Sequence, residues 1–479
     1  MTEPNPRRRD VADLGRVHFV GIGGAGMSGI ARIMLAQGAE VTGCDARESR
    51  AVTALRALGV DVSVGHDAVH AVAADTLVIS TAVRADTEEL VEASRLGRPV
   101  IPRAAALAAV MSGRRGVAVA GTHGKTTTTS MLTVALQACG RDPSYAIGGD
   151  LNEPGSNGHL GTGEIFVAEA DESDRSFLLL SPEIAVVTNV EADHLDNYGD
   201  ADAVLDAFRD FVGRVDVDGS LVVGADDPGA RSLAEVAAAR SLRTLTFGRT
   251  NDADVRIDDL VIEGAASRFQ IVAGGRRLGA VALRVPGVYN ALNAAAAIAA
   301  GLQIGLPFAD MARGLADFTG ARRRFELKGV AGAVRVYDDY AHHPTELRSL
   351  LAAAKEVAGE GRVIAVFQPH LYSRTSLFAQ DFADALSAAD VAVVMEVYAA
   401  REDPVPGVTG ALVADRIALD RDQAIFEPSW TAVAGRVAAL ARPGDLILTV
   451  GAGDVTLLGQ EILTAIEELR ADTATDGRA

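Results

Sequence analysis

The stretch GTHGKT (Gly121–Thr126) is the part of the sequence that says most about the fold of this chain and its binding site. It follows the apolar run Gly116–Ala120 and leads into a threonine-rich segment, an order that predicts a strand, a tight glycine turn and a helix. Such a turn aims backbone N–H groups and a helix N-terminus at one point, which suits a phosphate. Lys125 adds a mobile positive charge, and Thr126 offers a hydroxyl to a magnesium ion. An ordinary glycine turn is the alternative, because Val119 stands where the common phosphate loop has its first glycine.

The composition limits the classes of function. The chain has 479 residues, 48% of them hydrophobic, which is enough for roughly two to four domains. Its 64 acidic and 45 basic residues leave a net charge of −19, which argues against nucleic acid or an anionic membrane as a partner. Cys44 and Cys139 give no disulfide framework, and no apolar run approaches the roughly 18 residues of a membrane span. We therefore expect a cytoplasmic protein, a monomer or weak dimer, that acts on small molecules.

Short apolar runs alternate with helical patterns almost throughout, which predicts an α/β fold with mostly parallel sheets. Three blocks follow one another, over residues 16–112, 113–321 and 322–470. The polar ends, residues 1–15 and 471–479, are expected to be a disordered segment and a tail. Strands are expected at Arg16–Val20, Glu40–Cys44, Thr76–Ser80, Ile165–Ala168, Ile184–Val187, Val334–Tyr337, Val363–Phe367, Val391–Met395 and Leu446–Val450, and a β-like alternation extends over residues 252–285.

A second glycine turn, GIGGAG (Gly21–Gly26), fits G-x-G-x-x-G directly after a strand. Asp45 ends the next strand, where a ribose-binding carboxylate belongs. Alone, this pattern predicts dinucleotide binding by a nicotinamide dehydrogenase, or simply tight packing of a strand on a helix. A redox enzyme does not explain the phosphate loop further along the chain. Two anion-binding turns instead suggest two phosphorylated ligands, one that supplies energy and one that is acted upon.

Two acidic segments follow buried strands of the middle block. They are EADESD (Glu169–Asp174) and NVEADH (Asn189–His194). Magnesium takes oxygen ligands and needs only a few protein groups. Carboxylates at neighbouring strand ends could reach one ion beside the phosphate loop, with His194 completing the site; a solvated loop is the alternative.

Together these motifs resemble the Mur ligase family, whose members join amino acids to a UDP-muramoyl precursor of peptidoglycan. The family's shortened phosphate loop also accounts for the missing first glycine. The resemblance covers about Arg16–Leu469 and rests on GIGGAGMSGIA (Gly21–Ala31), GTHGKTTT (Gly121–Thr128), EADESD (Glu169–Asp174), NVEADHLD (Asn189–Asp196), YNALNAAAA (Tyr289–Ala297), GARRRFE (Gly320–Glu326), DDYAHHPTE (Asp338–Glu346), FQPHLYSRT (Phe367–Thr375) and GAGD (Gly451–Asp454).

The resemblance implies a Rossmann-like UDP-substrate-binding domain, a central P-loop-type ATPase domain and a Rossmann-like amino-acid-binding domain in the three blocks. It also implies an ATP- and Mg²⁺-dependent ligase of cytoplasmic peptidoglycan synthesis, a pathway of cell-wall biogenesis, cell shape and cell division. ATP would phosphorylate the carboxylate of UDP-N-acetylmuramate, and an amine would attack the acyl phosphate. GMSGIA and Asp338–Tyr340 favour L-alanine as the amine. A ligase that adds a recycled tripeptide is the nearest alternative, and a non-catalytic nucleotide-binding switch is another.

The resemblance also implies roles for single residues. For catalysis they are Lys125, Arg324, Asp339 and His342. For ATP they are Gly121, Thr122, His123, Gly124, Lys125, Thr126, Thr127, Asn290, Asn293 and Arg324. For the UDP-substrate they are Gly21, Gly23, Gly24, Ala25, Gly26, Met27, Ser28, Asp45 and Thr81. For magnesium they are Thr126, Glu169 and His194, and for the amino acid Tyr340, His342 and Arg374. Asp339 or His342 could take the proton of the alanine amine, and Arg374 could clamp its carboxylate.

Overall fold

The computed structural model describes residues 10–151, 156–400 and 402–476. The chain divides into two compact units. The first unit comprises Met1–Asp259, Phe269–Ala282 and Ala291–Phe318, and the second comprises Leu260–Arg268, Leu283–Asn290 and Thr319–Ala479. The first two sequence blocks thus fall mainly in one unit, and the boundaries expected between the three domains remain predictions.

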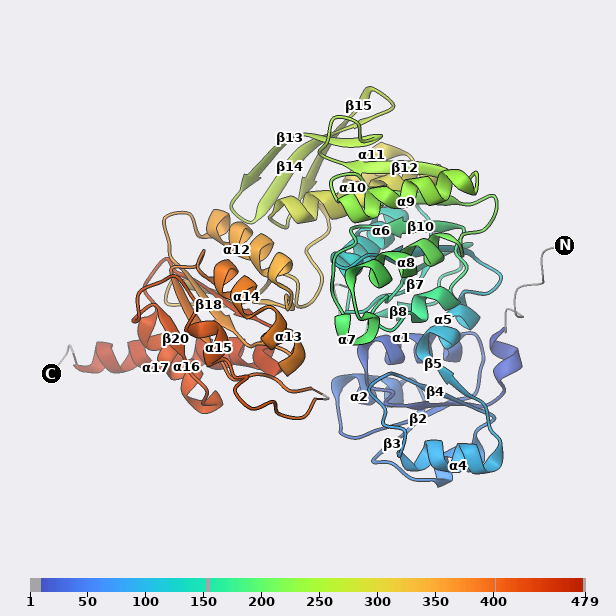
Figure 1. The fold of residues 1–479 in the computed structure, drawn as a ribbon, viewed down its shortest axis with the longest axis horizontal. Helices are drawn as coiled ribbons and strands as arrows, with labels where there is room; N and C mark the ends of the chain where they lie inside the picture. Colours follow the sequence, from blue (N-terminus) through green and yellow to red (C-terminus); the bar gives the residue numbers. More distant parts are fainter. Residues whose placement is uncertain (1–9, 152–155, 401, 477–479) are drawn as a thin grey trace. The chain divides into compact units, whose positions relative to one another are not determined.

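The first unit begins with a parallel sheet (Figure 1). Its central strand carries the first glycine turn. Its strands are β1 (Val17–Val20), β2 (Val41–Asp45), β3 (Asp61–Val64), β4 (Thr76–Ile79) and β5 (Val100–Pro102), and its helices are α1 (Ala25–Ala36), α2 (Arg50–Ala57), α3 (Val69–Ala73), α4 (Glu88–Leu96) and α5 (Arg103–Met111). The spatial order is β3-β2-β1-β4-β5. Because the order reverses at β1, the turn after it lies where doubly wound sheets bind nucleotides.

The segment before β1 differs from the expected disorder over residues 1–15. Val11–Leu14 form a short 3-10 helix, and Leu14 is buried in the core of the unit. The backbone N–H of Asp10 donates to the Asp13 carboxylate and closes this turn. Burial of an apolar side chain offsets the entropy of ordering the segment. Residues 1–9 lie outside the described residues.

The larger sheet, which lies mainly in the first unit, carries the second glycine turn. Its strands are β6 (Arg115–Ala120), β7 (Ser144–Ala146), β8 (Gly158–His159), β9 (Ile165–Glu169), β10 (Ile184–Val187), β11 (Ser220–Gly224), β12 (Arg243–Gly248), β13 (Val255–Glu263), β14 (Ala266–Ala273) and β15 (Arg276–Leu283). Its helices are α6 (Lys125–Ala138), α7 (Leu195–Tyr198), α8 (Ala201–Val212), α9 (Pro228–Ala239), α10 (Val288–Ile304) and α11 (Phe308–Ala316), with a 3-10 turn at Ser176–Leu179. β6 lies between β10 and β9 and is parallel to both. Its apolar sequence fits a strand covered on both faces.

The second unit contains a further sheet, in the order β16-β17-β21-β18-β19-β20, which is parallel except for the β16–β17 pair. Its strands are β16 (Glu326–Ala331), β17 (Val334–Asp339), β18 (Val363–Phe367), β19 (Val391–Val394), β20 (Ala424–Phe426) and β21 (Leu446–Val450). Its helices are α12 (Pro344–Ala358), α13 (Tyr372–Leu377), α14 (Ala379–Leu386), α15 (Ala411–Ala414), α16 (Trp430–Leu440) and α17 (Leu458–Asp476), with a 3-10 turn at Asp454–Leu457.

The end of the second unit also differs from the expectation. Helix α17 continues to Asp476, although a tail was expected from residue 471. No glycine or proline stands between Gln460 and Asp476, so nothing in this part of the sequence forces an earlier stop. Residues 477–479 lie outside the described residues.

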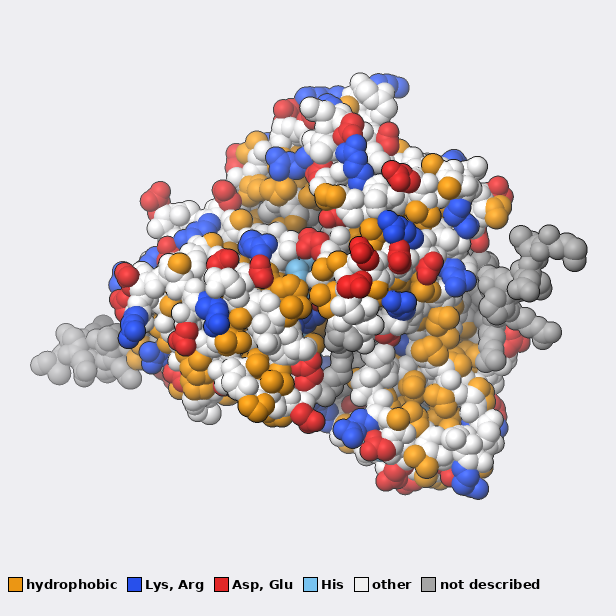
Figure 2. All heavy atoms as spheres, in the orientation of Figure 1, with side chains coloured by type: hydrophobic (Ala, Val, Ile, Leu, Met, Phe, Trp, Pro, Cys, Tyr) orange, Lys and Arg blue, Asp and Glu red, His pale blue; other side chains and the backbone are white. Residues whose placement is uncertain are grey.

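The predicted α/β fold class is confirmed, and the expected strands are present with ends that differ by a residue or two. The largest difference is at β17, which runs two residues beyond Tyr337, so that Asp338 and Asp339 pair within the sheet instead of following it. The alternation over residues 252–285 becomes β13, β14 and β15. In the part of the chain that the structure describes, no helix combines the length and apolarity needed to cross a membrane. Acidic and basic side chains are interspersed on the face shown in Figure 2.

Candidate functional site

The second glycine turn is held by the segment that follows β10. Thr122 N donates to Asn189 O over 3.0 Å, and His123 N donates to the Asn189 side-chain oxygen over 2.8 Å. The Thr188 hydroxyl donates to His123 O over 2.6 Å. Gly121 has φ 135°, and an added Cβ there would collide with the Thr188 hydroxyl. The turn therefore needs glycine for both its backbone and its packing.

The Lys125 side chain lies over this turn and pairs with Glu172, an acid that was not predicted as a site residue. Its ammonium lies 2.7 Å from Glu172 Oε2 and donates to Gly121 O over 2.7 Å. Glu172 is 1% exposed, and burial raises the pKa of its carboxyl to about 7 against the pull of the Lys125 charge. Burial disfavours the Lys125 ammonium, but Glu172 and Asp171 outweigh it and raise the pKa of Lys125. Lys125 thus remains charged and is held beside the turn.

The three residues predicted to bind magnesium are arranged around the same acidic segment. Thr126 is buried in the first turn of α6, directly after Lys125. Glu169 ends β9 and accepts a hydrogen bond from Gly148 N over 2.8 Å. His194 Nε2 lies 3.8 Å from Glu172 Oε1. The same nitrogen lies 3.6 Å from Asp193 Oδ2, so the acids beside His194 are Asp193 and Glu172, and a shared site for Glu169 and His194 remains a prediction.

The first glycine turn opens onto a pocket of about 300 Å³. Five residues predicted to bind the UDP-substrate line it: Gly24, Ala25, Gly26, Met27 and Thr81. Arg103, the first residue of α5, also lines the pocket, and its guanidinium donates to Asp171 Oδ2 over 2.7 Å. A Cβ at Gly26 would collide with that guanidinium. A cation and a set of backbone N–H groups at a helix N-terminus suit a phosphorylated ligand.

The other residues predicted for the UDP-substrate have structural partners. Asp45 accepts a hydrogen bond from Gly23 N over 2.8 Å, and a Cβ at Gly23 would lie 2.8 Å from the same oxygen. The Ser28 hydroxyl accepts a hydrogen bond from the Asn157 amide over 3.0 Å. Gly21 adopts φ 78° at the end of β1. These residues shape the turn, and Asp45 and Ser28 lie outside the set that lines the pocket.

The two asparagines predicted to contact the adenine are buried on α10. The Asn293 side-chain oxygen accepts a hydrogen bond from the Thr128 hydroxyl over 3.2 Å, and a Cβ at Gly124 would collide with it. The Asn290 amide donates to Pro286 O over 2.7 Å. Asn293 therefore packs directly against the second glycine turn.

In the second unit, Asp339 is buried at the end of β17. Its two oxygens accept hydrogen bonds from Phe325 N over 2.7 Å and from Ala341 N over 2.8 Å. Burial raises the pKa of the Asp339 carboxyl to about 6, against the opposing charge of Arg324. Both oxygens are thus engaged in holding the loops on either side of the strand.

The remaining residues predicted for the second unit lie around Tyr340. The Tyr340 ring lies 5.1 Å from the Arg324 guanidinium carbon and 5.2 Å from the centre of the His342 ring. His342 N donates to Glu346 Oε2 over 2.9 Å, and Arg324 Nη1 lies 4.0 Å from Glu346 Oε1. Arg374 is 6% exposed on α13. The structure thus brings Arg324, Asp339, Tyr340 and His342 together around the loop after β17.

Three residues that contact the two glycine turns or their helices were not identified from the sequence: Glu172, Arg103 and Asn157. Glu172 lies in the quoted acidic segment, but nothing in that segment distinguishes it from its neighbours. Arg103 directly follows a strand, which is a weak indication of a site residue. Asn157 lies in a loop whose contact with α1 depends on tertiary structure.

Comparison with protein-family models gives three consecutive matches. The model for the Mur ligase family, catalytic domain, matches residues 16–115. The Mur ligase middle domain matches residues 119–301, and the Mur ligase glutamate ligase domain matches residues 323–453.

Full-length relatives and solved structures agree with these matches. The chain is 58% identical to a UDP-N-acetylmuramate–L-alanine ligase of Acidothermus cellulolyticus, covering 97% of each chain. It is 54% identical to the enzyme of the same name from Saccharopolyspora erythraea, covering 98% of each. The structure of a UDP-N-acetylmuramate–alanine ligase from Thermotoga maritima matches with a TM-score of 0.78 and 29% identity, covering 95% of this chain and 99% of the other. A murein peptide ligase from Psychrobacter arcticus matches with a TM-score of 0.69 and 26% identity, over the same shares.

Proposed function

Because this chain belongs to the Mur ligase family, we propose that it joins L-alanine to the carboxylate of UDP-N-acetylmuramate at the expense of ATP. The observation that carries the proposal is the identity of more than half of the residues, over nearly the full length, with relatives that bear this activity in their names. The setting is the cytoplasmic synthesis of peptidoglycan precursors.

The reaction brings together two anions, ATP and the carboxylate of UDP-N-acetylmuramate. A carboxylate resists attack by an amine because attack adds negative charge to it. Transfer of the γ-phosphoryl group of ATP to a carboxylate oxygen releases ADP and gives an acyl phosphate. The amine of alanine then attacks the carbonyl carbon, the C–O bond to phosphate breaks, and the amine loses a proton.

Lys125 supports the phosphoryl transfer in this scheme. Its charged ammonium sits over the second glycine turn, within 2.7 Å of Gly121 O, where it would stabilise the charge on the transferred phosphoryl group. The backbone N–H groups of the turn and the N-terminus of α6 would hold the remaining phosphates. Glu172 keeps Lys125 in place before the nucleotide binds.

Oxygen donors around this turn fit Mg²⁺. The Thr126 hydroxyl follows Lys125, and the Glu169 carboxylate stands at the end of β9, the strand next to β6. Bound magnesium would offset the repulsion between the nucleotide and the acceptor carboxylate. His194 remains the third proposed ligand.

The first turn would receive the UDP-substrate. The pocket lined by Gly24, Ala25, Gly26 and Thr81 offers backbone donors, and Arg103 offers a guanidinium for a diphosphate. Asn290 and Asn293 of α10 would lie near the adenine. In the second unit, Arg324 would contact phosphate and Arg374 would bind the alanine carboxylate. Asp339 or His342 would accept the proton of the amine; the raised pKa of Asp339, about 6, suits a group that takes up a proton near neutral pH.

The test is phosphate release with ATP, UDP-N-acetylmuramate and each amino acid in turn. We expect release with L-alanine, and none when either the amino acid or the UDP-sugar is omitted. Phosphate release with the recycled tripeptide but not with alanine would contradict the proposal and indicate a ligase that adds the tripeptide to UDP-N-acetylmuramate. Hydrolysis of ATP without any amino acid would indicate a nucleotide switch.

A further inference from the structure

A buried cluster of metal-ligating side chains lies in the first sheet, outside the pocket onto which the first glycine turn opens. It consists of His18 on β1, Cys44 on β2, His70 on α3 and Glu89 on α4. One ligand atom from each lies within 4.8 Å of the ligand atoms of the other three. We propose that these four side chains bind a divalent transition metal of the zinc class.

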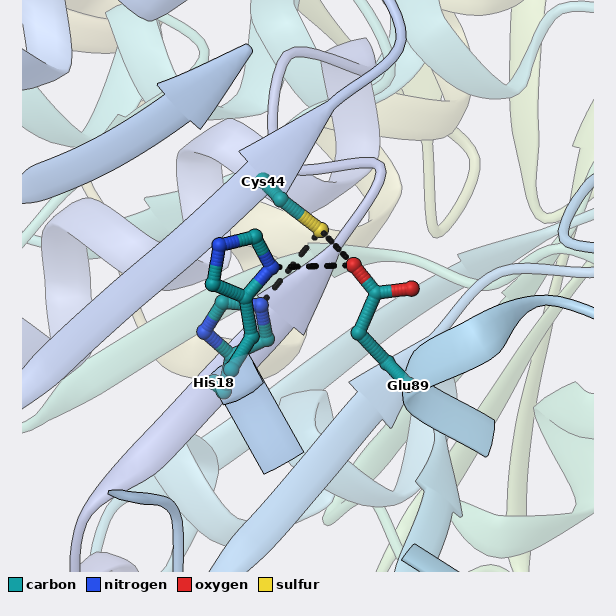
Figure 3. A group of neighbouring side chains, drawn as sticks. His18, Cys44 and Glu89 are labelled. Carbon is teal, nitrogen blue, oxygen red and sulfur yellow. Dashed lines mark hydrogen bonds and ion pairs between the residues drawn. The ribbon is translucent and has the colours of Figure 1, made fainter. Parts of the chain in front are cut away.

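Three of the distances between the donor atoms lie between 3.0 and 3.4 Å, slightly shorter than or equal to those of a tetrahedral zinc site. His18 Nε2 lies 3.4 Å from Cys44 Sγ, which lies 3.1 Å from Glu89 Oε1 (Figure 3). His70 Nδ1 lies 3.0 Å from the same Glu89 oxygen. At zinc's usual bond lengths, tetrahedral ligand atoms are roughly 3.4–3.7 Å apart. Small rotations of the side chains, which point toward one another, therefore suffice to open the site around an ion.

The partners of these donors leave the right atoms free to coordinate. His18 Nδ1 lies 2.9 Å from the Thr42 hydroxyl. When Nδ1–H donates to that hydroxyl, the lone pair of Nε2 is directed at the Cys44 sulfur. Thr42 and Cys44 are two residues apart on β2, so both side chains lie on the same face of the sheet as His18, which pairs with Thr42 in the register. The strand thus supplies both a ligand and the group that orients another ligand.

The Cys44 side chain is the ligand whose proton must leave on metal binding. Its sulfur donates a hydrogen bond to Glu89 Oε1 over 3.1 Å. A cysteine binds zinc as the thiolate, so metal binding would replace the thiol proton, which is released to solvent as the S–metal bond forms.

The surroundings favour a structural ion. Val20, Ala71, Ala74, Leu77 and Ala93 form an apolar cluster with Cys44. A thiolate and imidazoles suit zinc, whereas Mg²⁺ prefers oxygen ligands, so the ion of the proposed ligase reaction does not satisfy this site. His66 Nδ1, on a side chain that is 34% exposed, lies 3.2 Å from Glu89 and 3.7 Å from the Cys44 sulfur, at the exposed edge of the cluster. Cys44 O also accepts from Gly21 N over 2.8 Å, so a metal at Cys44 would anchor the first glycine turn.

The experiment is a titration of the metal-free full-length chain with Co²⁺, which reports thiolate ligation through a sulfur-to-cobalt charge-transfer band. We expect the band to saturate at one ion per chain, to be displaced by Zn²⁺ and to be unaffected by Mg²⁺. Cys44→Ser should abolish the band, and Cys139→Ser, the matched control at the other cysteine, should retain it. Absence of the band in the wild-type chain, or its persistence in Cys44→Ser, would overturn the proposal.

A milder variant keeps the test decisive if Cys44→Ser does not fold. His70 has 16% of its side chain exposed, so His70→Gln disturbs the core less than a change at Cys44. We expect His70→Gln to keep the charge-transfer band but to weaken Co²⁺ binding by at least about tenfold. The midpoint of thermal unfolding should also rise with Zn²⁺ in the wild-type chain, and rise less in His70→Gln. Equal Co²⁺ affinity of His70→Gln and wild type would remove His70 from the site and contradict the four-ligand proposal.

Discussion

The two glycine turns of the first unit share a strand–turn–helix geometry but obtain their positive charge in different ways. In the turn after β6 the cation is Lys125, which belongs to the turn itself and pairs with Glu172. In the turn after β1 the cation is Arg103, which comes from α5 and pairs with Asp171. Asp171 and Glu172 are consecutive residues, so one acidic segment holds the cations of both turns. The first turn thus depends on tertiary structure for its charge, and the second carries its charge in its own sequence.

The difference extends to the two carboxyl groups. The charges of Arg103 and Lys125 outweigh burial and lower the pKa of Asp171 to about 2. At Glu172 burial outweighs Lys125 and raises the pKa to about 7. Asp171 is thus a permanent anion near neutral pH, whereas Glu172 is close to exchanging its proton. Glu172 can therefore release Lys125 to an incoming phosphate at a smaller electrostatic cost than Asp171 would.

The largest effect is expected from removing the cation of the second turn. Lys125→Ala should lower alanine-dependent phosphate release by at least about 100-fold, because the transferred phosphoryl group loses its nearest positive charge. The Glu172 carboxyl can take up a proton when Lys125 is lost, so the chain should remain folded, as circular dichroism would check. Lys355→Ala is the matched control, since Lys355 pairs with Asp390 in the second unit. Normal turnover of Lys125→Ala would remove the second turn from the proposed ATP site.

The next effect concerns the pH dependence set by Glu172. The folded chain raises the pKa of this carboxyl from its ordinary 4.5 to about 7, so folding favours the protonated form. Its contribution to stability is therefore complete below about pH 4.5 and is lost as the pH rises through 7, a change of about 3 kcal/mol. Glu172→Gln should remove this part of the pH dependence. Urea unfolding of the chain without metal or nucleotide, at about pH 5 and about pH 8, measures it.

Glu164→Gln is the control for that experiment, because the Glu164 side chain is 61% exposed. Its unfolding midpoints should follow those of the wild-type chain at both pH values. If the Glu172→Gln variant followed the wild-type chain as well, the contrast between the two carboxyl groups would be wrong.

The contrast between the turns also explains what could be predicted from the sequence. Both turns are local patterns, a strand followed by glycines and a helix, and their strands and helices are present as expected. The pairing of Arg103 with Asp171 joins residues far apart in the chain, and no local pattern indicates it. Asp45 fits the ribose position by spacing, yet its carboxylate accepts the N–H of Gly23. The cluster around Cys44 likewise depends on four separate elements.

Two glycine substitutions, one in each turn, test whether the two turns bind different ligands. Gly121→Ala places a Cβ against Thr188 at φ 135°, and we expect it to raise the KM for ATP by about tenfold or more while leaving the KM for UDP-N-acetylmuramate unchanged. Gly23→Ala places a Cβ 2.8 Å from Asp45 Oδ2 and should have the opposite pattern.

Gly38→Ala is the control for strain without collision. Gly38 has φ 87° but no heavy atom within 4 Å of the added Cβ, so this variant should change stability and neither KM. If Gly121→Ala and Gly23→Ala changed both KM values equally, the two turns would not serve separate ligands.

The smallest effect should come from a residue that belongs to neither turn. Arg374 is 6% exposed on α13 of the second unit, and its proposed partner is the carboxylate of alanine. Arg374→Ala should raise the KM for L-alanine by about tenfold, since a charge-assisted hydrogen bond contributes about 1.5–3 kcal/mol. Arg374→Lys should recover only part of the loss, because an ammonium keeps the charge but lacks the two-pronged geometry of a guanidinium. The KM values for ATP and UDP-N-acetylmuramate should stay at their wild-type levels in both variants. A changed KM for the UDP-sugar with an unchanged KM for alanine would assign Arg374 to the ligand of the first turn, and would show that the charge of that turn comes from more of the chain than Arg103.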